Sequence, residues 1–225
     1  MTMPDETDTI GSIVLMADPR VTAIPVSDNG EDLTDARDHG LRTSTFRADD
    51  ADDFTHVRAG LATRLVQASE ALPRGVHLLL IEGYRPPALQ RRYFDGYLSS
   101  LREASPASGE ERLRMLASRY VSPPEIAPHS AGAAIDLTLC ADDGTELDLG
   151  SAVNASPEQS AGACYTHHPS VEGEARRNRA ILGEALSAAG LVNYPTEWWH
   201  WSYGDRYWAM ATGTSHAIYG ATNRT

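Results

Sequence analysis

Pro195-Thr196-Glu197-Trp198-Trp199-His200-Trp201 is the stretch around which this chain of 225 residues is organised. It places a carboxylate and an imidazole three positions apart among indole rings, and all four tryptophans of the chain lie between Trp198 and Trp208. A buried ionisable group costs several kcal/mol unless it is paired or bound to a metal. The stretch therefore predicts a functional site that has a partner elsewhere in the chain.

The best partner is the run from His129 to Leu139, which supplies a second imidazole and a second carboxylate, Asp136, beside small residues. Together with His200 and a free glutamate, Glu197, these residues form the inventory of a catalytic zinc site. The sequence thus predicts a metallohydrolase with one zinc ion per chain. Two histidines and one carboxylate also suit iron(II), so a non-haem iron enzyme stays an alternative.

Strand geometry bears on whether these side chains can meet. Along the second run, Ile135 and Leu137 fall on one face of a strand and Asp136 falls on the other, and Gly132 permits a bend that brings His129 over Asp136. Residues three apart on a regular strand point to opposite faces. Glu197 and His200 can therefore share a site only through a bulge, a strong twist, or a turn that holds the glutamate after Pro195.

Composition and charge limit the classes of partner. The formal net charge of −12 disfavours nucleic acid and anionic membrane surfaces, and a small-molecule substrate is expected. All nineteen basic side chains are arginine, which removes lysine chemistry. The two cysteines have no CxxC spacing. We expect no membrane span and no signal peptide, and hence a cytoplasmic protein, whereas the oligomeric state cannot be read from the sequence.

Hydrophobic patterns predict the elements and the fold class. No linker divides the chain, so we expect one domain over residues 1–225, in which 1–50 is poorly determined. Helices before His129 and strands after it favour an α+β fold with a mainly antiparallel sheet packed against helices. The expected strands are 12–16, 76–81, 135–139, 146–149, 192–194 and 198–203, and the expected helices are 52–72, 88–101, 109–120 and 171–189.

Arg85 follows the predicted strand 76–81 and precedes two prolines, which fix an extended or turn conformation. A guanidinium held by a rigid turn at the end of a buried strand is well placed to face a cleft. It can equally pair with Glu82 as a structural ion pair, and the residues alone leave both readings open.

Three motifs in order now carry a resemblance: Gly83-Tyr-Arg85-Pro, His129 with Asp136-Leu-Thr-Leu seven positions later, and Glu197-Trp-Trp-His200. Together they resemble the zinc D-alanyl-D-alanine dipeptidases of the VanX type, within a wider group of peptidoglycan peptidases that shares its zinc site with hedgehog-type domains. The resemblance extends with gaps from about Val76 to Trp201, and it implies the fold of that group.

The resemblance implies a role for each matching residue. Zinc would be held by His129, Asp136 and His200, Glu197 would be the general base, and Arg85 would stabilise charge on the attacked carbonyl. The implied reaction is hydrolysis of an amide bond in a small dipeptide. A general base of this kind and one preorganised donor are common catalytic devices.

The chain departs from the family pattern where the family binds substrate. Ala127 stands where the family has a serine, and Asn154 stands where the family has an aspartate that helps to hold the ammonium group of the dipeptide. The family's Tyr-Ala-x-x-Asn-Phe segment is not recognisable, the nearest run being 41–46. We therefore expect a related dipeptidase or amidase with its own substrate.

Two other classes remain as alternatives. One is a zinc-binding module that has lost catalysis, against which the presence of Glu197 and Arg85 weighs. The other is a structural polar core without metal. Metal analysis of the purified protein would distinguish the second alternative from the others.

Overall fold

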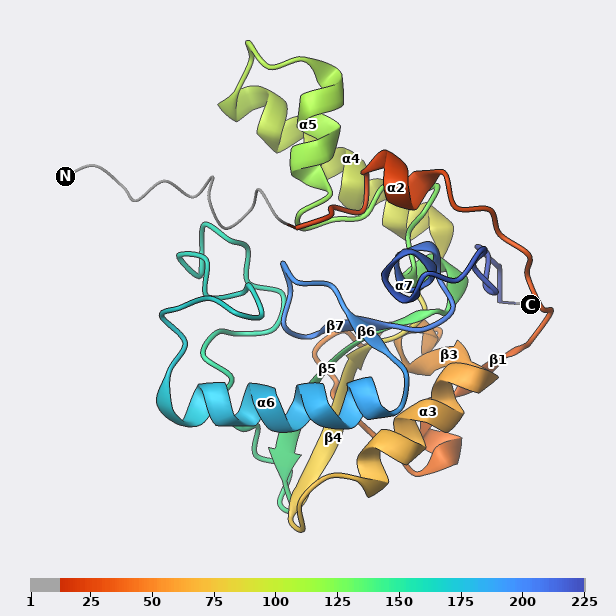
Figure 1. The fold of residues 1–225 in the computed structure, drawn as a ribbon, viewed down its shortest axis with the longest axis vertical. Coiled ribbons are helices and arrows are strands. Elements are labelled where there is room, and N and C mark those ends of the chain that lie inside the picture. Colours follow the sequence, from red (N-terminus) through yellow and green to blue (C-terminus); the bar gives the residue numbers. More distant parts are fainter. Residues whose placement is uncertain (1–12, 225) are drawn as a thin grey trace.

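The computed structural model describes residues 13–224 as an α+β fold, which confirms the predicted class (Figure 1). The helices are α2 (Pro19–Thr22), α3 (Ala59–Glu70), α4 (Pro87–Ala104), α5 (Glu110–Ala117), α6 (Gly173–Ala188) and α7 (Arg206–Thr212), with 3-10 turns η1 (Ala36–His39), η2 (Asp53–Thr55) and η3 (His129–Ala131). The strands are β1 (Leu33–Asp35), β2 (Arg42–Thr43), β3 (His56–Arg58), β4 (Val76–Glu82), β5 (Ala134–Ala141), β6 (Val192–Asn193) and β7 (His200–Ser202).

The main sheet has the strand order β2-β4-β5-β7-β6. β2 pairs with β4 in parallel, whereas the other neighbours pair antiparallel, as predicted. A separate small sheet joins β1 and β3. In Figure 1, α6 and α3 lie side by side against the sheet, and α4 and α5 lie together at the top of the view.

The main core lies between the sheet and the helices α3 and α6. Alternation along β5 places Ile135 and Leu137 in this core, and Leu61 of α3 and Leu182 of α6 pack from the helical side. Full burial of one such side chain contributes about 1.5 to 3 kcal/mol. The opposite face of β5 is left to carry Asp136, in agreement with the face predicted from the sequence.

A β-bulge in β4 determines which face Glu82 occupies. Leu80 pairs with Leu137 and Glu82 pairs with Asp136, so β4 uses two residues where β5 uses one. The extra residue, Ile81, turns Glu82 onto the face of Asp136, away from the main core. Without this bulge, an apolar side chain would lie beside Asp136.

Two glycines permit the close approach of the segments that follow. Gly132 has a φ of +63° and ends η3, so the chain turns from His129 into β5. A Cβ on Gly132 would collide with Leu33, and a Cβ on Gly83 would collide with the backbone oxygen of His56. The bend predicted at Gly132 is confirmed.

Some predicted elements were wrong. Residues 13–16 of the predicted strand 12–16 are not a strand, and position 12 lies outside the described residues. The helix predicted over 52–72 begins at Ala59, because η2 precedes it and β3 pairs with β1. The strand predicted over 146–149 is reduced to one bridge between Cys140 and Glu146.

The other predicted elements are present with shifted ends. The helix predicted from 171 begins at Gly173, with Glu172 as its N-cap residue. The predicted strand 198–203 is shorter, since β7 begins at His200. No helix within residues 13–224 has the length and apolar character that a bilayer crossing requires.

Candidate metal centre

Three neighbouring strands set the base of the candidate site. The sheet register pairs Glu82 with Asp136 and Asp136 with His200, so these three side chains stand in a row across β4, β5 and β7. All three residues are buried, and Asp136 is 2% exposed. Carboxylates and imidazoles at this depth require partners, since a buried unpaired charge is strongly unfavourable.

His129 enters the row from η3, above β5. Its Nδ1 lies 2.7 Å from the backbone oxygen of Gly83. A carbonyl oxygen can only accept, so Nδ1 carries a proton, and Nε2 is the ring nitrogen left to bind a metal through its lone pair. A backbone carbonyl that fixes the tautomer in this way is the usual second partner of a metal-binding histidine.

The free ring nitrogen of His129 faces two further donor atoms. Its Nε2 lies 3.2 Å from Nδ1 of His200 and 3.3 Å from Oδ1 of Asp136, and the latter two atoms are 3.0 Å apart. One shared proton can satisfy only one of these three contacts. A cation satisfies all of them, so this donor set fits a metal ion of the kind that binds nitrogen and oxygen ligands.

Burial and charge act against each other at these groups. Burial alone would raise the pKa of Asp136, but the two histidines beside it lower that pKa below the usual range and keep the carboxylate ionised. Burial lowers the pKa of His200, against the opposing effect of Asp136. Nε2 of His200 is buried and has no hydrogen-bond partner among the described residues. An ionised aspartate and a neutral imidazole are the forms that a metal requires.

Glu197 lies in the turn between β6 and β7 and not on a regular strand. Its side chain can therefore lie on the same side as that of His200, although the two residues are three positions apart. The N–H of Glu197 donates to the oxygen of Tyr194 at 2.9 Å, and its own backbone oxygen accepts from the N–H of His200 at 3.1 Å. Oε2 of Glu197 is then 3.8 Å from Nδ1 of His200. Burial raises the pKa of Glu197 well above its usual range, and the charge of Asp136 raises it further. A carboxylate with a raised pKa suits proton transfer.

Asn193 of β6 holds this turn from behind. Its Nδ2 donates to the backbone oxygens of Glu197 and His200, both at 3.0 Å. Its Oδ1 accepts from the hydroxyl of Thr166 at 2.5 Å. The geometry of the turn is thus fixed by a side chain that sequence reasoning did not single out.

Arg85 adopts both of the arrangements that the sequence left open. Its Nε and Nη2 donate to the carboxylate of Glu82 at 2.6 and 2.7 Å, and its Nη1 donates to Oε1 of Gln90 at 2.8 Å. The same guanidinium lines the cavity above His129. Arg85 is therefore a rigidly held cation at the edge of the donor cluster.

One cavity of about 220 Å³, called here the site cavity, opens onto the cluster. The structure brings His129, Asp136, His200, Glu197, Arg85 and Asn154 together in its wall. Ala127 is buried next to a separate small pocket of about 30 Å³ and is not part of that wall. Asn154 therefore lines the site cavity, whereas Ala127 does not.

Several wall residues were missed or misread from the sequence. Tyr93 and Tyr97 of α4 pack against the core cluster of Phe94, and both also line the site cavity, as do Tyr120 and Arg47. Burial raises the pKa of Tyr97 to about 12, so its hydroxyl keeps its proton. Tyr97 lies three positions after Phe94 and shares its side of the helix, so helical spacing gave no signal that it also lines a cavity. Arg47 follows β2 in a polar region that carried no pattern.

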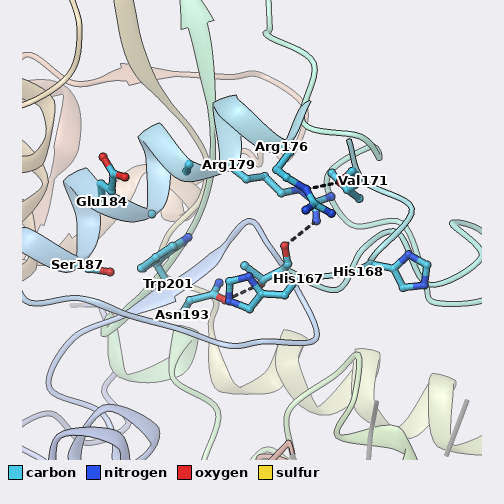
Figure 2. A pocket seen from close by; sticks show the side chains of 12 residues that line it. His167, His168, Val171, Arg176, Arg179, Glu184, Ser187, Asn193 and Trp201 are labelled. Atoms are coloured by element: carbon cyan, nitrogen blue, oxygen red, sulfur yellow. Dashed lines mark hydrogen bonds between the residues drawn. The ribbon is translucent and has the colours of Figure 1, made fainter. Parts of the chain in front are cut away.

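A larger cavity of about 550 Å³, the α6 cavity, lies between α6 and the loop 166–171 (Figure 2). Figure 2 shows Arg176 and Arg179 reaching from α6 towards this loop, with Trp201 and Asn193 on the other side. The adjacent His167 and His168 line it, and neither belongs to the donor cluster of His129, Asp136 and His200. Its volume exceeds that of the site cavity, but it contains no cluster of metal-ligand atoms among the described residues.

Three curated D-alanyl-D-alanine dipeptidases resemble this chain. The Synechocystis protein is 28% identical over 86% of this chain and 90% of its own length. The Enterococcus faecium protein is 31% identical over 64% of this chain and 71% of its own. The Escherichia coli protein is 42% identical over 32% of this chain and 35% of its own.

Two solved structures resemble the fold more distantly. The LdcB LD-carboxypeptidase has a TM-score of 0.47 and 16% identity, covering 84% of this chain and 76% of its own. The vancomycin resistance D,D-pentapeptidase VanY has a TM-score of 0.33 and 16% identity, covering 72% of this chain and 80% of its own.

The family model described as D-ala-D-ala dipeptidase matches residues 51–217, which contain all the residues of the donor cluster. This range is most of the chain and confirms the resemblance drawn from the three motifs. Membership indicates a metal-dependent peptide hydrolase. The chain belongs to the D-ala-D-ala dipeptidase family of metallopeptidases.

Proposed function

We propose that this protein is a zinc-dependent hydrolase of the amide bond in a small D-amino-acid dipeptide, either D-Ala-D-Ala or a related substrate. The observation that carries the proposal is the convergence of three ligand atoms, from His129, Asp136 and His200, beside the buried carboxylate of Glu197. Family membership supports the reaction class. The small site cavity supports a small substrate, since cavities for drug-sized ligands are typically about 300 to 1,000 Å³.

His129, Asp136 and His200 would hold the metal through Nε2, Oδ1 and Nδ1. A bound zinc ion supplies Lewis-acid chemistry there, polarising a carbonyl group and lowering the pKa of a water molecule to about 7. Gly83 keeps the lone pair of His129 directed at the cluster, and the sheet register keeps Asp136 beside His200. The chain thus presents a fixed set of ligands before any ion binds.

Glu197 is the proposed general base. Its carboxylate takes a proton from the attacking water and gives it to the nitrogen of the leaving amine as the C–N bond breaks. Burial raises the pKa of Glu197 well above its usual range, which favours its holding the proton between the two transfers. The turn held by Asn193 keeps the carboxylate next to the cluster.

Arg85 is the proposed donor to the carbonyl oxygen as negative charge develops on it. Glu82 and Gln90 hold its guanidinium in place, so its orientation requires no rearrangement during the reaction. Loss of one preorganised donor of this kind typically costs about 3 to 4 kcal/mol of transition-state stabilisation.

The substrate pocket supports a related substrate as well as D-Ala-D-Ala. Asn154 lines the site cavity with an amide where the family has a carboxylate, so it offers a hydrogen bond without a charge. Specificity at such positions depends on leaving no buried polar group unpaired. We therefore propose a preference that differs from that of a dedicated D-Ala-D-Ala dipeptidase.

The test is a screen of zinc-loaded protein against dipeptides and N-acyl dipeptides of both chiralities. We expect hydrolysis of D,D substrates that stops on chelation and returns on addition of zinc. Ala127→Ser should change activity little, because Ala127 lies outside the wall of the site cavity. Absence of amide hydrolysis across the panel in protein that binds zinc would leave a binding module instead.

A further inference from the structure

Arg47 occupies the junction between the site cavity and a wider groove on the surface. This outer groove, of about 770 Å³, is lined by Phe46 and by the loop 150–155, among other residues. Arg47, Tyr120 and Asn154 line both the groove and the site cavity. These three side chains therefore lie where the site cavity and the outer groove adjoin.

The guanidinium of Arg47 is weakly engaged by the protein itself. Its Nε is buried and has no hydrogen-bond partner among the described residues. The same Nε forms a long ion pair with Oε2 of Glu82 at 3.7 Å, and that carboxylate already accepts two short hydrogen bonds from Arg85. The rings of Phe46 and Tyr93 lie 5.6 and 5.9 Å from the guanidinium and restrict its position. Within residues 13–224, Arg47 thus has one long ion pair and no side-chain hydrogen bond, so its guanidinium can still donate to a ligand.

Asn154 provides a second unused donor in the same wall. Its backbone adopts a φ of +62°, and its carbonyl oxygen accepts from the hydroxyl of Tyr120 at 2.8 Å, which fixes the loop. Its Nδ2 is buried without a hydrogen-bond partner among the described residues. Buried polar atoms are nearly always satisfied, so two free donors in one cavity wall indicate that the wall binds an acceptor.

We propose that Arg47 and Asn154 form a carboxylate subsite that selects the substrate. A guanidinium and a neutral amide together recognise an anion and offer nothing to an ammonium group. The chain carries a net charge of −12, so a local cation is needed to attract an anionic ligand. The inference rests on the proposed peptide hydrolysis. The carboxylate comes either from the C-terminus of the dipeptide or from an acidic N-acyl group that reaches into the outer groove.

The experiment measures binding by calorimetry and is independent of turnover. N-acetyl-D-alanine and its amide differ only in the C-terminal carboxylate, whereas N-succinyl-D-alaninamide and its terminal amide, N-succinamoyl-D-alaninamide, differ only in an acyl carboxylate. We expect the wild-type protein to bind the acid of at least one pair about tenfold more tightly than its neutral partner, as one charge-assisted contact would give. The pair that shows the preference identifies the source of the carboxylate.

Arg47→Gln should abolish this preference, and Arg47→Lys should keep part of it. Arg91→Gln is the matched control, because Arg91 is exposed on α4 and does not line the cavity, so the preference should be unchanged. Asn154→Asp, which tolerates a positive φ, should weaken binding of the acid more than that of the amide. This second variant tests the wall even where replacement of Arg47 prevents folding.

The outcomes separate this inference from the proposed function. Equal binding of acid and amide by the wild type in both pairs would overturn it, as would a preference that survives in Arg47→Gln. The latter result would leave Arg47 as a partner of Glu82 only. A preference that disappears in Arg47→Gln, in a protein that hydrolyses no peptide, would support the subsite while contradicting the proposed hydrolysis.

Discussion

The site cavity and the α6 cavity differ in what their polar atoms do. In the larger α6 cavity, Arg179 donates to the backbone oxygens of Leu149, Tyr165, Thr166 and Ala163 at 2.7 to 3.1 Å. Among the described residues that line the smaller site cavity, Nε of Arg47 and Nδ2 of Asn154 are buried without a hydrogen-bond partner. Unsatisfied buried groups need a ligand, whereas satisfied ones stabilise the fold. Pairing of polar atoms is therefore a better guide to function here than volume.

The largest expected effect is on Glu197. Glu197→Gln removes the proposed base from the site cavity but keeps its size, so kcat should fall by about 10²- to 10⁴-fold. Zinc content should stay at the wild-type level, because the amide replaces no ligand atom of the cluster. Activity and metal content of the same preparation check this. A variant that retains more than a tenth of wild-type kcat would show that another group accepts the proton.

The next effect tests the structural role of the α6 cavity. Arg179→Met leaves several buried carbonyl oxygens without a donor and should lower the free energy of unfolding by about 3 kcal/mol. Arg176→Met is the matched control, since its one short hydrogen bond is to the oxygen of Val171, and it should cost about 1 kcal/mol. Denaturant titration measures both. Equal stability of the two variants would contradict the structural role given to Arg179.

Metal binding should depend on the histidines of the donor cluster and not on those of the α6 cavity. Zinc at 100 times its Kd should raise the free energy of unfolding by about 2.7 kcal/mol, because the folded state alone presents the ligands together. His129→Asn should remove this gain, whereas His167→Asn in the α6 cavity should retain it. Thermal unfolding with zinc and with a chelator gives the comparison. Loss of the gain in His167→Asn would mean that the metal binds elsewhere.

Glu31 is a fully paired carboxylate outside both cavities, so its replacement should change stability and not activity. Glu31 accepts from Tyr219, from the N–H of Gly60 and from Asn29, and although burial opposes it, these bonds lower its pKa. A lowered pKa in the folded state stabilises the protein above the usual carboxyl range, and the stabilisation is lost as pH falls. Glu31→Gln should therefore be less stable than the wild type at about pH 7, and the difference should shrink towards about pH 3. Unfolding midpoints at both pH values test this.

The sequence predicted the donor cluster because each ligand lies in a short motif whose local geometry is determined nearby. Gly132 sets the bend after His129, and Pro195 begins the turn that holds Glu197. The structure brings the three ligand residues and Glu197 together, while their catalytic and metal-binding roles stay predictions. The alternation along β5 likewise gave the face of Asp136.

Features that depend on distant segments were not predictable in the same way. The predicted start of α3 was wrong because β1, some twenty residues earlier, pairs with His56–Arg58 and prevents a helix there. The bulge that turns Glu82 towards Asp136 depends on pairing between β4 and β5 and leaves no local signature. Arg47 reaches the site cavity only because β2 joins the sheet edge beside β4.

The smallest expected effect tests whether a substitution in the α6 cavity changes catalysis in the site cavity. Glu184 is exposed on α6 and lines the α6 cavity, so Glu184→Gln should change kcat by less than twofold and stability by less than about 0.5 kcal/mol. Asn193 also lines the α6 cavity, but unlike Glu184 it donates to the backbone oxygens of Glu197 and His200.

Asn193→Ala should therefore lower kcat while Glu184→Gln does not, and assays of both variants under one condition provide the contrast. A loss in Asn193→Ala that appears in kcat and not in zinc content would assign the amide to positioning of Glu197. A tenfold loss in Glu184→Gln would instead make the α6 cavity part of the catalytic machinery, which would overturn the distinction between paired and unpaired polar groups.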